Sequence, residues 1–441
     1  MKTNEELSKE YKEFISKGKT ERECVKLAVK MAEEKGYKNI NSYSKLQPGD
    51  KVYATNHAKS FVAFLIGSKP LSEGIRLLGA HIDSPRLDLK QHPFYEDGGL
   101  ALAKTHYYGG IKNYQWVTLP MALHGVVCKK DGTIVEINIG EDVNDPVVGI
   151  TDLLIHLAKE QMEKKAPKVI EGEELNVTLG SLPLKDVDKD PVKANILKLL
   201  KDKYDIAESD FISAEIEVVP AGPARDYGLD RSMIMGYGQD DRVCAFTSLA
   251  ALLELEKTDR TAGALLVDKE EIGSVGASGM HSRFFDDLLV KILALKEGYD
   301  ELKMRSLYEH SDMLSSDVSA GFDPTFPSVM EPLNAAYLGK GICLNKYVGS
   351  AGKAGTNDAD PEYIARVTKA FEDDKVSYQT CELGKVDAGG GGTIAYIMAN
   401  YNMNVIDCGV AVLSMHSPWE VTSKLDIYET YRAYLAFIKR I

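Results

Sequence analysis

The sequence has 441 residues, of which 44% are hydrophobic and 27% charged, so the chain can bury a sizeable core and is not predicted to be disordered. Its 53 basic and 66 acidic residues give a net charge of −13, which argues against a dedicated nucleic-acid-binding protein. A charged N-terminus and the lack of a run of about 18 apolar residues exclude a secretion signal and a membrane span. The six cysteines are widely spaced, which favours reduced core thiols in a cytoplasmic protein.

The first hundred residues predict helices followed by buried strands. Apolar residues recur at near-helical spacing in the charged segment 21–35, which predicts an amphipathic helix. Segments 60–66 and 76–83 are mostly apolar and end at Gly67 and at Ser84-Pro85. Such runs are typical of strands that are buried on both faces of a sheet.

Short β-like pieces replace these elements from about residue 95 to residue 233. The turn Lys130-Asp131-Gly132 predicts a hairpin between two of them, and a charged stretch, 159–203, interrupts the pattern. The pieces are 116–119, 125–128, 133–138 and 215–219. We interpret this region as a separate β-rich domain.

Strand and helix patterns alternate again in the last two hundred residues. A helix is predicted at 240–256, a strand at 262–268 and a helix at 284–295, and the alternation continues to the last residue. This order indicates an α/β sandwich with a mostly parallel sheet. The sequence therefore predicts one α/β domain, residues 1–93 and 234–441, interrupted by a β-rich insertion, residues 94–233.

Acidic and histidine residues lie where several of these elements begin or end. Ligands of open α/β sheets bind outside the carboxyl ends of the strands. His81 and Asp83 end one strand, where Asp83 can accept the second ring N–H of His81, as carboxylates do behind a metal-bound histidine. A structural histidine at a strand end is the alternative.

Paired acids occur at two further junctions. Asp240 and Asp241 open a helix, where an N-cap and a first-turn acid would explain them equally well. Glu270 and Glu271 follow a strand; adjacent glutamates can divide metal binding from general-base catalysis, or simply begin a loop.

Asp317 and His416 lie at similar apolar-to-polar junctions, and the whole set is more specific than its members. Two histidines and three carboxylates can hold two divalent ions when one carboxylate bridges them. Histidine and carboxylate ligands with an open position suit hydrolytic Zn²⁺. Two ions about 3.5–4 Å apart would activate a water.

The chain resembles, over nearly its whole length, the bacterial branch of the aspartyl aminopeptidase (aminopeptidase I) family of dizinc exopeptidases. Five ordered segments carry the resemblance: GAHIDSPRLDLK at 79–90, YGQDDR at 237–242, DKEEIGS at 268–274, SSD at 315–317 and AVLSMHSP at 411–418. It implies a three-layer α/β/α catalytic domain with an inserted β-rich oligomerisation domain.

The resemblance also implies a role for each motif residue. Asp240 matches the bridging ligand, with Asp241 as the adjacent alternative, Glu270 matches the general base, and Asp83 would orient His81. The terminal metal ligands are matched by His81, Glu271, Asp317 and His416. The implied enzyme is a zinc metalloaminopeptidase in which two divalent ions, most readily Zn²⁺ but also Co²⁺ or Mn²⁺, activate the water that Glu270 deprotonates.

Substrate contacts and assembly follow from the same resemblance, which implies a tetrahedral homo-dodecamer acting on peptides. His156 matches a histidine that reaches a neighbouring subunit's active site, although a buried helix residue would give the same pattern. Lys346 can pair with an acidic N-terminal side chain or be merely solvated. The chain reads SAGFD at 319–323, where strict acidic-residue peptidases often carry further histidines, so specificity for N-terminal Asp or Glu stays open.

Three other functions are compatible with parts of the pattern. A related dizinc aminopeptidase of neutral specificity would share every ligand. An N-acyl amino acid deacylase would share the metal chemistry, but segments 84–87 and 236–242 favour a peptidase. A non-catalytic shell protein would keep the fold, and the intact ligand set argues against it.

Overall fold

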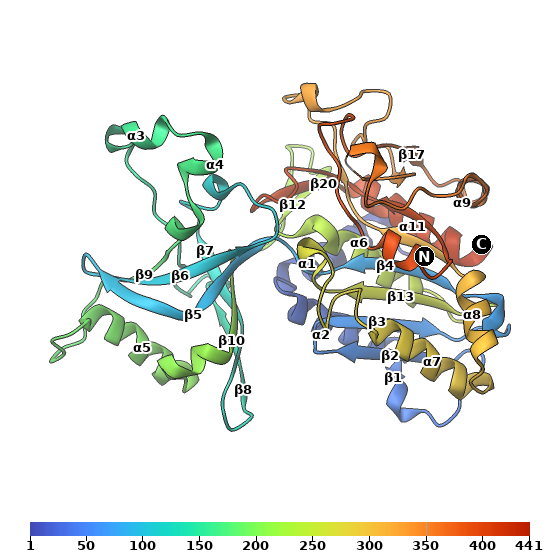
Figure 1. Cartoon of the computed structure of the whole chain (residues 1–441), viewed down its shortest axis with the longest axis horizontal. Helices are drawn as coiled ribbons and strands as arrows, with labels where there is room; N and C mark the ends of the chain where they lie inside the picture. Colours follow the sequence, from blue (N-terminus) through green and yellow to red (C-terminus); the bar gives the residue numbers. More distant parts are fainter. Residues whose placement is uncertain (350) are drawn as a thin grey trace. The chain divides into compact units, whose positions relative to one another are not determined.

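The computed structural model describes residues 1–349 and 351–441, and the chain divides into two compact units (Figure 1). The larger unit comprises Met1–Asp83, Ala224–Met415 and Glu420–Ile441, and the smaller one comprises Ser84–Pro223 and His416–Trp419. The smaller unit begins at Ser84, whereas the sequence placed its start at residue 94. The reason is that strand β5 (Arg86–Asp97) already pairs with β6 (Leu100–Tyr108) from Arg86 onward.

Within the described residues, a nine-stranded mixed sheet forms the centre of the larger unit (Figure 1). In spatial order its strands are β1 (Lys38–Asn39), β2 (Lys51–Asn56), β3 (Ser60–Leu65), β13 (Ala262–Val267), β4 (Arg76–His81), β14 (Asp312–Ser316), β18 (Asn404–Gly409), β16 (Ile342–Asn345) and β17 (Tyr378–Thr380). The neighbours β13, β4, β14 and β18 run parallel. Their carboxyl ends therefore lie at one edge of the sheet.

Helices cover both faces of this sheet, because alternate strand residues point to opposite sides. In β3, Phe61 and Ala63 join one core cluster, whereas Val62 and Phe64 join the other. The first cluster includes α1 (Asn4–Lys17), α2 (Glu21–Glu34), α6 (Gln239–Leu253), α9 (Pro361–Asp373) and α11 (Lys424–Arg440), and the second includes α7 (Phe284–Glu297), α8 (Glu301–Glu309) and α10 (Ala395–Ala399). The predicted three-layer α/β/α fold is confirmed.

A second sheet of the larger unit connects the start of α6 to the C-terminal strands. Its order, over the described residues, is β11 (Arg225–Tyr227), β12 (Met233–Gly236), β20 (Glu420–Ser423), β19 (Ala411–Leu413) and β15 (Ser319–Ala320). In the antiparallel pair β12–β20, Gly236 lies opposite Glu420. This register places Glu420 beside the turn that leads into α6.

The smaller unit is built on a six-stranded antiparallel sheet. Its order is β8 (Ile134–Ile139), β7 (Met121–Cys128), β10 (Ala214–Pro220), β5, β6 and β9 (Val177–Gly180), and its helices are α3 (Lys159–Met162), α4 (Ala166–Val169) and α5 (Pro191–Tyr204). The predicted hairpin joins β7 to β8. The strand predicted at 116–119 is wrong, because Thr118 adopts a φ of 60°, which interrupts an extended chain.

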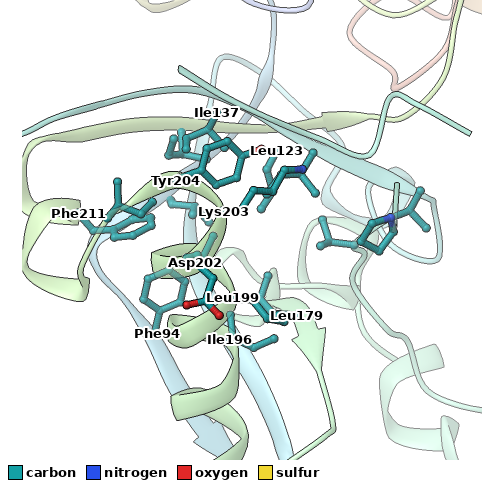
Figure 2. A pocket seen from close by; sticks show the side chains of 18 residues that line it. Phe94, Leu123, Ile137, Leu179, Ile196, Leu199, Asp202, Lys203, Tyr204 and Phe211 are labelled. Carbon is teal, nitrogen blue, oxygen red and sulfur yellow. The ribbon is translucent and has the colours of Figure 1, made fainter. Parts of the chain in front are cut away.

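An apolar hollow of about 470 Å³ lies between α5 and the sheet of the smaller unit (Figure 2). Phe94 and Phe211 meet edge to face in its wall, with ring centroids 4.6 Å apart. None of its lining residues belongs to the predicted ligand set. Among the helices of the described residues, none has the length and apolarity that a membrane crossing needs.

Candidate metal centre

The ends of three adjacent strands position most of the predicted site residues of the larger unit. His81 is the last residue of β4, and Asp317 directly follows β14. Glu270 and Glu271 begin the 3-10 turn after β13. Because β13, β4 and β14 are parallel neighbours, these four side chains start from the same edge of the sheet.

Asp240, near the start of α6, adds a fifth side chain to this edge. The Nε2 atom of His81 lies 3.2 Å from Asp240 Oδ1 and 3.8 Å from Glu270 Oε2. One ligand atom from each of His81, Asp240 and Asp317 lies within 4.8 Å of the other two. A ligand atom of Asp240 also lies within 4.8 Å of a ligand atom of Glu271. Asp241 belongs to neither group in the part of the chain that the structure describes. The carboxylate of Asp240 therefore lies between two sets of ligand atoms.

Asp83 holds several of these residues in place from behind. Its carboxylate is fully buried and accepts the backbone N–H groups of Glu270 and Glu271, at 3.1 and 3.2 Å. The Nδ1 atom of His81 lies 3.4 Å from Asp83 Oδ1 and 3.0 Å from the Asp83 carbonyl oxygen. When Nδ1 donates to these oxygens, Nε2 carries the lone pair and faces Asp240.

The electrostatics of this cluster fit a cation. Burial, followed by the charge of Asp241, raises the pKa of Asp317 well above its ordinary value. Burial and the neighbouring Asp240 likewise raise the pKa of Asp241, against the opposing effect of His81. Burial disfavours the charged form of His81, but the contacts with Asp240 and Asp83 outweigh it and raise its pKa. Carboxylate oxygens and an imidazole nitrogen are donors that Zn²⁺ accepts, so the residues fit a metal ion.

His416 lies in the short segment His416–Trp419 that packs with the smaller unit, directly after Met415 of the larger unit. Its Nδ1 atom lies 2.8 Å from the carbonyl oxygen of Gly110. An Nδ1–H that donates there leaves Nε2 as the nitrogen with a lone pair, which is the arrangement of a metal-binding histidine. Its φ of 63° is uncommon for a residue other than glycine.

The two predicted substrate-binding residues lie on exposed surfaces. His156 is exposed in the 3-10 turn Ile155–Leu157, so the alternative of a buried helix residue is wrong. Lys346 is exposed, and its Nζ atom lies 3.8 Å from Asp358.

Two contacts near the cluster have no signal in the local sequence. Arg242 Nε donates to the carbonyl oxygen of Ile82, at 3.0 Å. Glu420 Oε2 accepts the backbone N–H of Asp240, at 3.2 Å. Both join segments that are more than a hundred residues apart in the chain, so no motif of neighbouring residues can reveal them.

Comparison with known proteins gives full-length matches. The family model described as "Aminopeptidase I zinc metalloprotease (M18)" matches residues 14–438. The Clostridium acetobutylicum protein named "Probable M18 family aminopeptidase 1" is 61% identical over 437 residues, which cover 98% of this chain and 94% of that protein.

Solved structures agree with this match. The crystal structure of aminopeptidase I from Clostridium acetobutylicum has a TM-score of 0.92 and 59% identity, and the match covers 98% of this chain and 95% of that one. The crystal structure of an M18 family aminopeptidase from Thermotoga maritima has a TM-score of 0.96 and 45% identity, with 99% and 97% covered.

Proposed function

Since the chain belongs to the M18 aminopeptidase I family of zinc metalloproteases and is a metallo-aminopeptidase, we propose that its catalytic centre holds two divalent ions at the carboxyl ends of β4, β13 and β14. His81 and Asp317 would hold one ion, and Glu271 and His416 the other. Asp240 would be shared, and its position close to His81, Asp317 and Glu271 is the observation that carries the proposal. Zn²⁺ suits these donors best, with Co²⁺ and Mn²⁺ as alternatives.

The ions, when bound, supply Lewis acidity to the attacking water and the scissile carbonyl. Glu270 is the general base: it takes a proton from the water and returns it to the leaving amine. Its side chain is 15% exposed, so water can reach it, and its carboxylate lies on the His81 side of the cluster. Asp83 accepts the Glu270 N–H and thereby orients the base together with His81.

The substrates in this proposal are peptides with a free N-terminus, and an acidic first residue is the preferred one. Lys346 is the residue proposed to pair with an acidic first side chain; its ammonium group is exposed and forms a weak surface pair with Asp358, at 3.8 Å. A substrate carboxylate can therefore displace Asp358 at low cost.

A homo-oligomer completes the proposal, with the smaller unit as its oligomerisation domain. A yeast aminopeptidase of the same fold, 20% identical with a TM-score of 0.80, is described as a dodecamer. The smaller unit exposes Leu154, Ile155 and Leu157 around His156, and clustered exposed apolar residues are typical of interaction sites. In this arrangement His156 contacts substrate in a neighbouring subunit's centre. The cytoplasmic location stays a prediction.

The test is hydrolysis of aminoacyl-p-nitroanilides with Asp, Glu, Leu, Lys or Ala, and of an N-acetylated amino acid. The purified protein is assayed with Zn²⁺, Co²⁺ or Mn²⁺, and again with a chelator. We expect chelator-sensitive cleavage that is fastest for Asp or Glu. Fastest cleavage of Leu or Ala would overturn the acidic preference alone, whereas cleavage of only the N-acetylated substrate would identify a deacylase. Metal binding without any hydrolysis would indicate a shell protein.

A further inference from the structure

The apolar hollow of the smaller unit is a pocket that the proposed function does not use. Its volume of about 470 Å³ falls within the range of about 300–1,000 Å³ that is usual for small-molecule sites. Helix α5 forms one wall, and strand residues such as Leu123 of β7 and Ile137 of β8 form the other (Figure 2). The pocket is therefore built from elements of one unit.

Helix α5 presents an apolar face to this hollow. Four of its residues line the hollow at the three- and four-residue spacing of one helix face: Ile196, Leu199, Leu200 and Tyr204. A face of this kind is normally covered by other apolar groups, yet Leu199 is 56% exposed. Val147, which also lines the hollow, is 53% exposed. Apolar surface that a ligand could cover thus remains in contact with solvent.

The same helix supplies a positive charge at the rim. Among the described residues that line the hollow, Lys203 is the only cation and Asp202 the only anion. Asp202 pairs with Lys198, one turn earlier on α5, which compensates its charge. Lys203 is 54% exposed and lies 3.8 Å from Asp145, a weak surface pair. Because Lys203 follows Leu199 by four residues, its alkyl stem continues the apolar face while its ammonium group reaches water.

Apolar walls with one cation at the rim select for an apolar tail that carries a negative head. Each CH₂ group of such a tail that leaves water for the hollow strengthens binding by about fourfold. A polar metabolite would lose its hydrogen bonds to water against these side chains. A protein partner would need a surface of about 800 Å² on each side, rather than a recess between a helix and a sheet.

We propose that this hollow binds a medium-chain fatty acid, with the alkyl chain between α5 and strands β7 and β8 and the carboxylate at Lys203. None of the proposed metal ligands lines the hollow, so this site is distinct from the metal centre and goes beyond the peptidase activity.

The test is isothermal titration calorimetry of the full-length protein with decanoate, and with octanoate and dodecanoate for comparison, each below its micelle concentration. We expect saturable binding of one molecule per subunit, which tightens by about fourfold for each added CH₂ group. No saturable binding, or an affinity that does not depend on chain length, would overturn the proposal.

Leu199→Glu locates the site. The substitution places a negative charge on the apolar wall and should abolish decanoate binding, and the exposure of Leu199 allows the chain to fold, which circular dichroism checks. Leu182→Glu is the matched control, because Leu182 belongs to the same unit, is 72% exposed and does not line the hollow. Decanoate binding that survives in Leu199→Glu, or is lost equally in both variants, would place the fatty acid elsewhere.

Lys203→Met tests the position of the carboxylate. Methionine keeps an apolar stem but removes the ammonium group, so the affinity for decanoate should fall by about fivefold while that for decanol stays unchanged. Lys201→Met is the control, since Lys201 lies on α5, pairs with Asp205 and does not line the hollow. An equal loss for decanoate and decanol would contradict a carboxylate at Lys203.

Sedimentation velocity of the same variants distinguishes a fatty acid from a second copy of the chain. We expect Leu199→Glu and the wild type to form oligomers of the same mass. If the wild type binds no fatty acid and Leu199→Glu changes the oligomer mass, the hollow is an interface between copies and the proposal is refuted.

Discussion

The Asp83 carboxylate contacts the ring of His81 and the backbone of both Glu270 and Glu271, so three site residues depend on one buried side chain. Because its two oxygens accept two consecutive N–H groups, the turn after β13 is held in a single orientation. Hydrogen bonds thus join the segment His81–Asp83 directly to Glu270 and Glu271, although 187 positions separate Asp83 from Glu270.

Glu270→Gln tests the general base most directly. The substitution keeps the size of the side chain but removes its ability to take a proton, so kcat should fall by roughly 10²–10⁴-fold. The bound zinc, measured by elemental analysis, should remain at the wild-type amount because Glu270 is not a proposed ligand. Near-wild-type turnover would rule out the assignment.

Asp407 predicts a pH dependence of stability that is independent of the metal centre. It is buried in β18 and accepts the hydroxyl of Thr393 at 2.7 Å, and burial raises its pKa to about 7. The unfolded chain has a pKa of about 3.9 for aspartate, so between these values the folded state binds the extra proton. The folded state is therefore favoured at the acidic end of this range and loses stability as the pH rises toward 7.

Asp407→Asn removes this titration while keeping an acceptor for Thr393. Urea unfolding of metal-free protein at about pH 5 and about pH 8 measures the effect. We expect the free energy of unfolding to fall more between the two conditions in the wild type than in the variant. Parallel changes in both proteins would contradict the raised pKa.

Close packing between the adjacent strands β14 and β18 determines the position of the Asp317 backbone. A Cβ atom added to Gly409 of β18 would lie 2.0 Å from the carbonyl oxygen of Asp317 and 2.6 Å from its carbonyl carbon. Glycine therefore allows the end of β14 to approach β18. The position of Asp317 therefore depends on a glycine at position 409 as well as on the ligand residue itself.

Gly409→Ala should displace the Asp317 backbone and destabilise the protein by about 1–3 kcal/mol, the usual effect of overpacking. Gly79→Ala is the control, because its Cβ would meet the terminal methyl of Met313 at 2.4 Å, and that methyl can rotate away. Urea unfolding should show the larger loss for Gly409→Ala, together with weaker zinc binding. Equal losses in both variants would show that Asp317 is not held by this packing.

At the scale of the whole molecule, a role of His156 in a neighbouring subunit predicts complementation. His156→Ala and Glu270→Gln subunits should each form oligomers of low activity. When the two are co-expressed, a centre with Glu270 from one subunit can receive His156 from its neighbour, so part of the activity returns. The kcat of the mixed oligomers measures this, and activity no higher than the average of the two variants would refute the role in trans.

Local patterns in the sequence predicted most of the fold. The apolar runs at 60–66 and 76–83 became β3 and β4, because such runs stay buried only within a covered sheet. The hairpin at Lys130-Asp131-Gly132 was likewise predicted from neighbouring residues, and it joins β7 to β8. The segment 116–119 was misread since its composition suits a strand while Thr118 turns the chain.

By itself, the sequence determined the α/β alternation and the acidic and histidine side chains at the ends of its elements, because both depend on neighbouring residues. Only the tertiary structure decided that Asp240, and not Asp241, offers an oxygen to the groups of ligand atoms, that Asp83 holds the two glutamates, and that Glu420 accepts the Asp240 N–H. The physical reason is distance along the chain: Glu420 and Asp240 are 180 residues apart, and strand pairing alone brings them together.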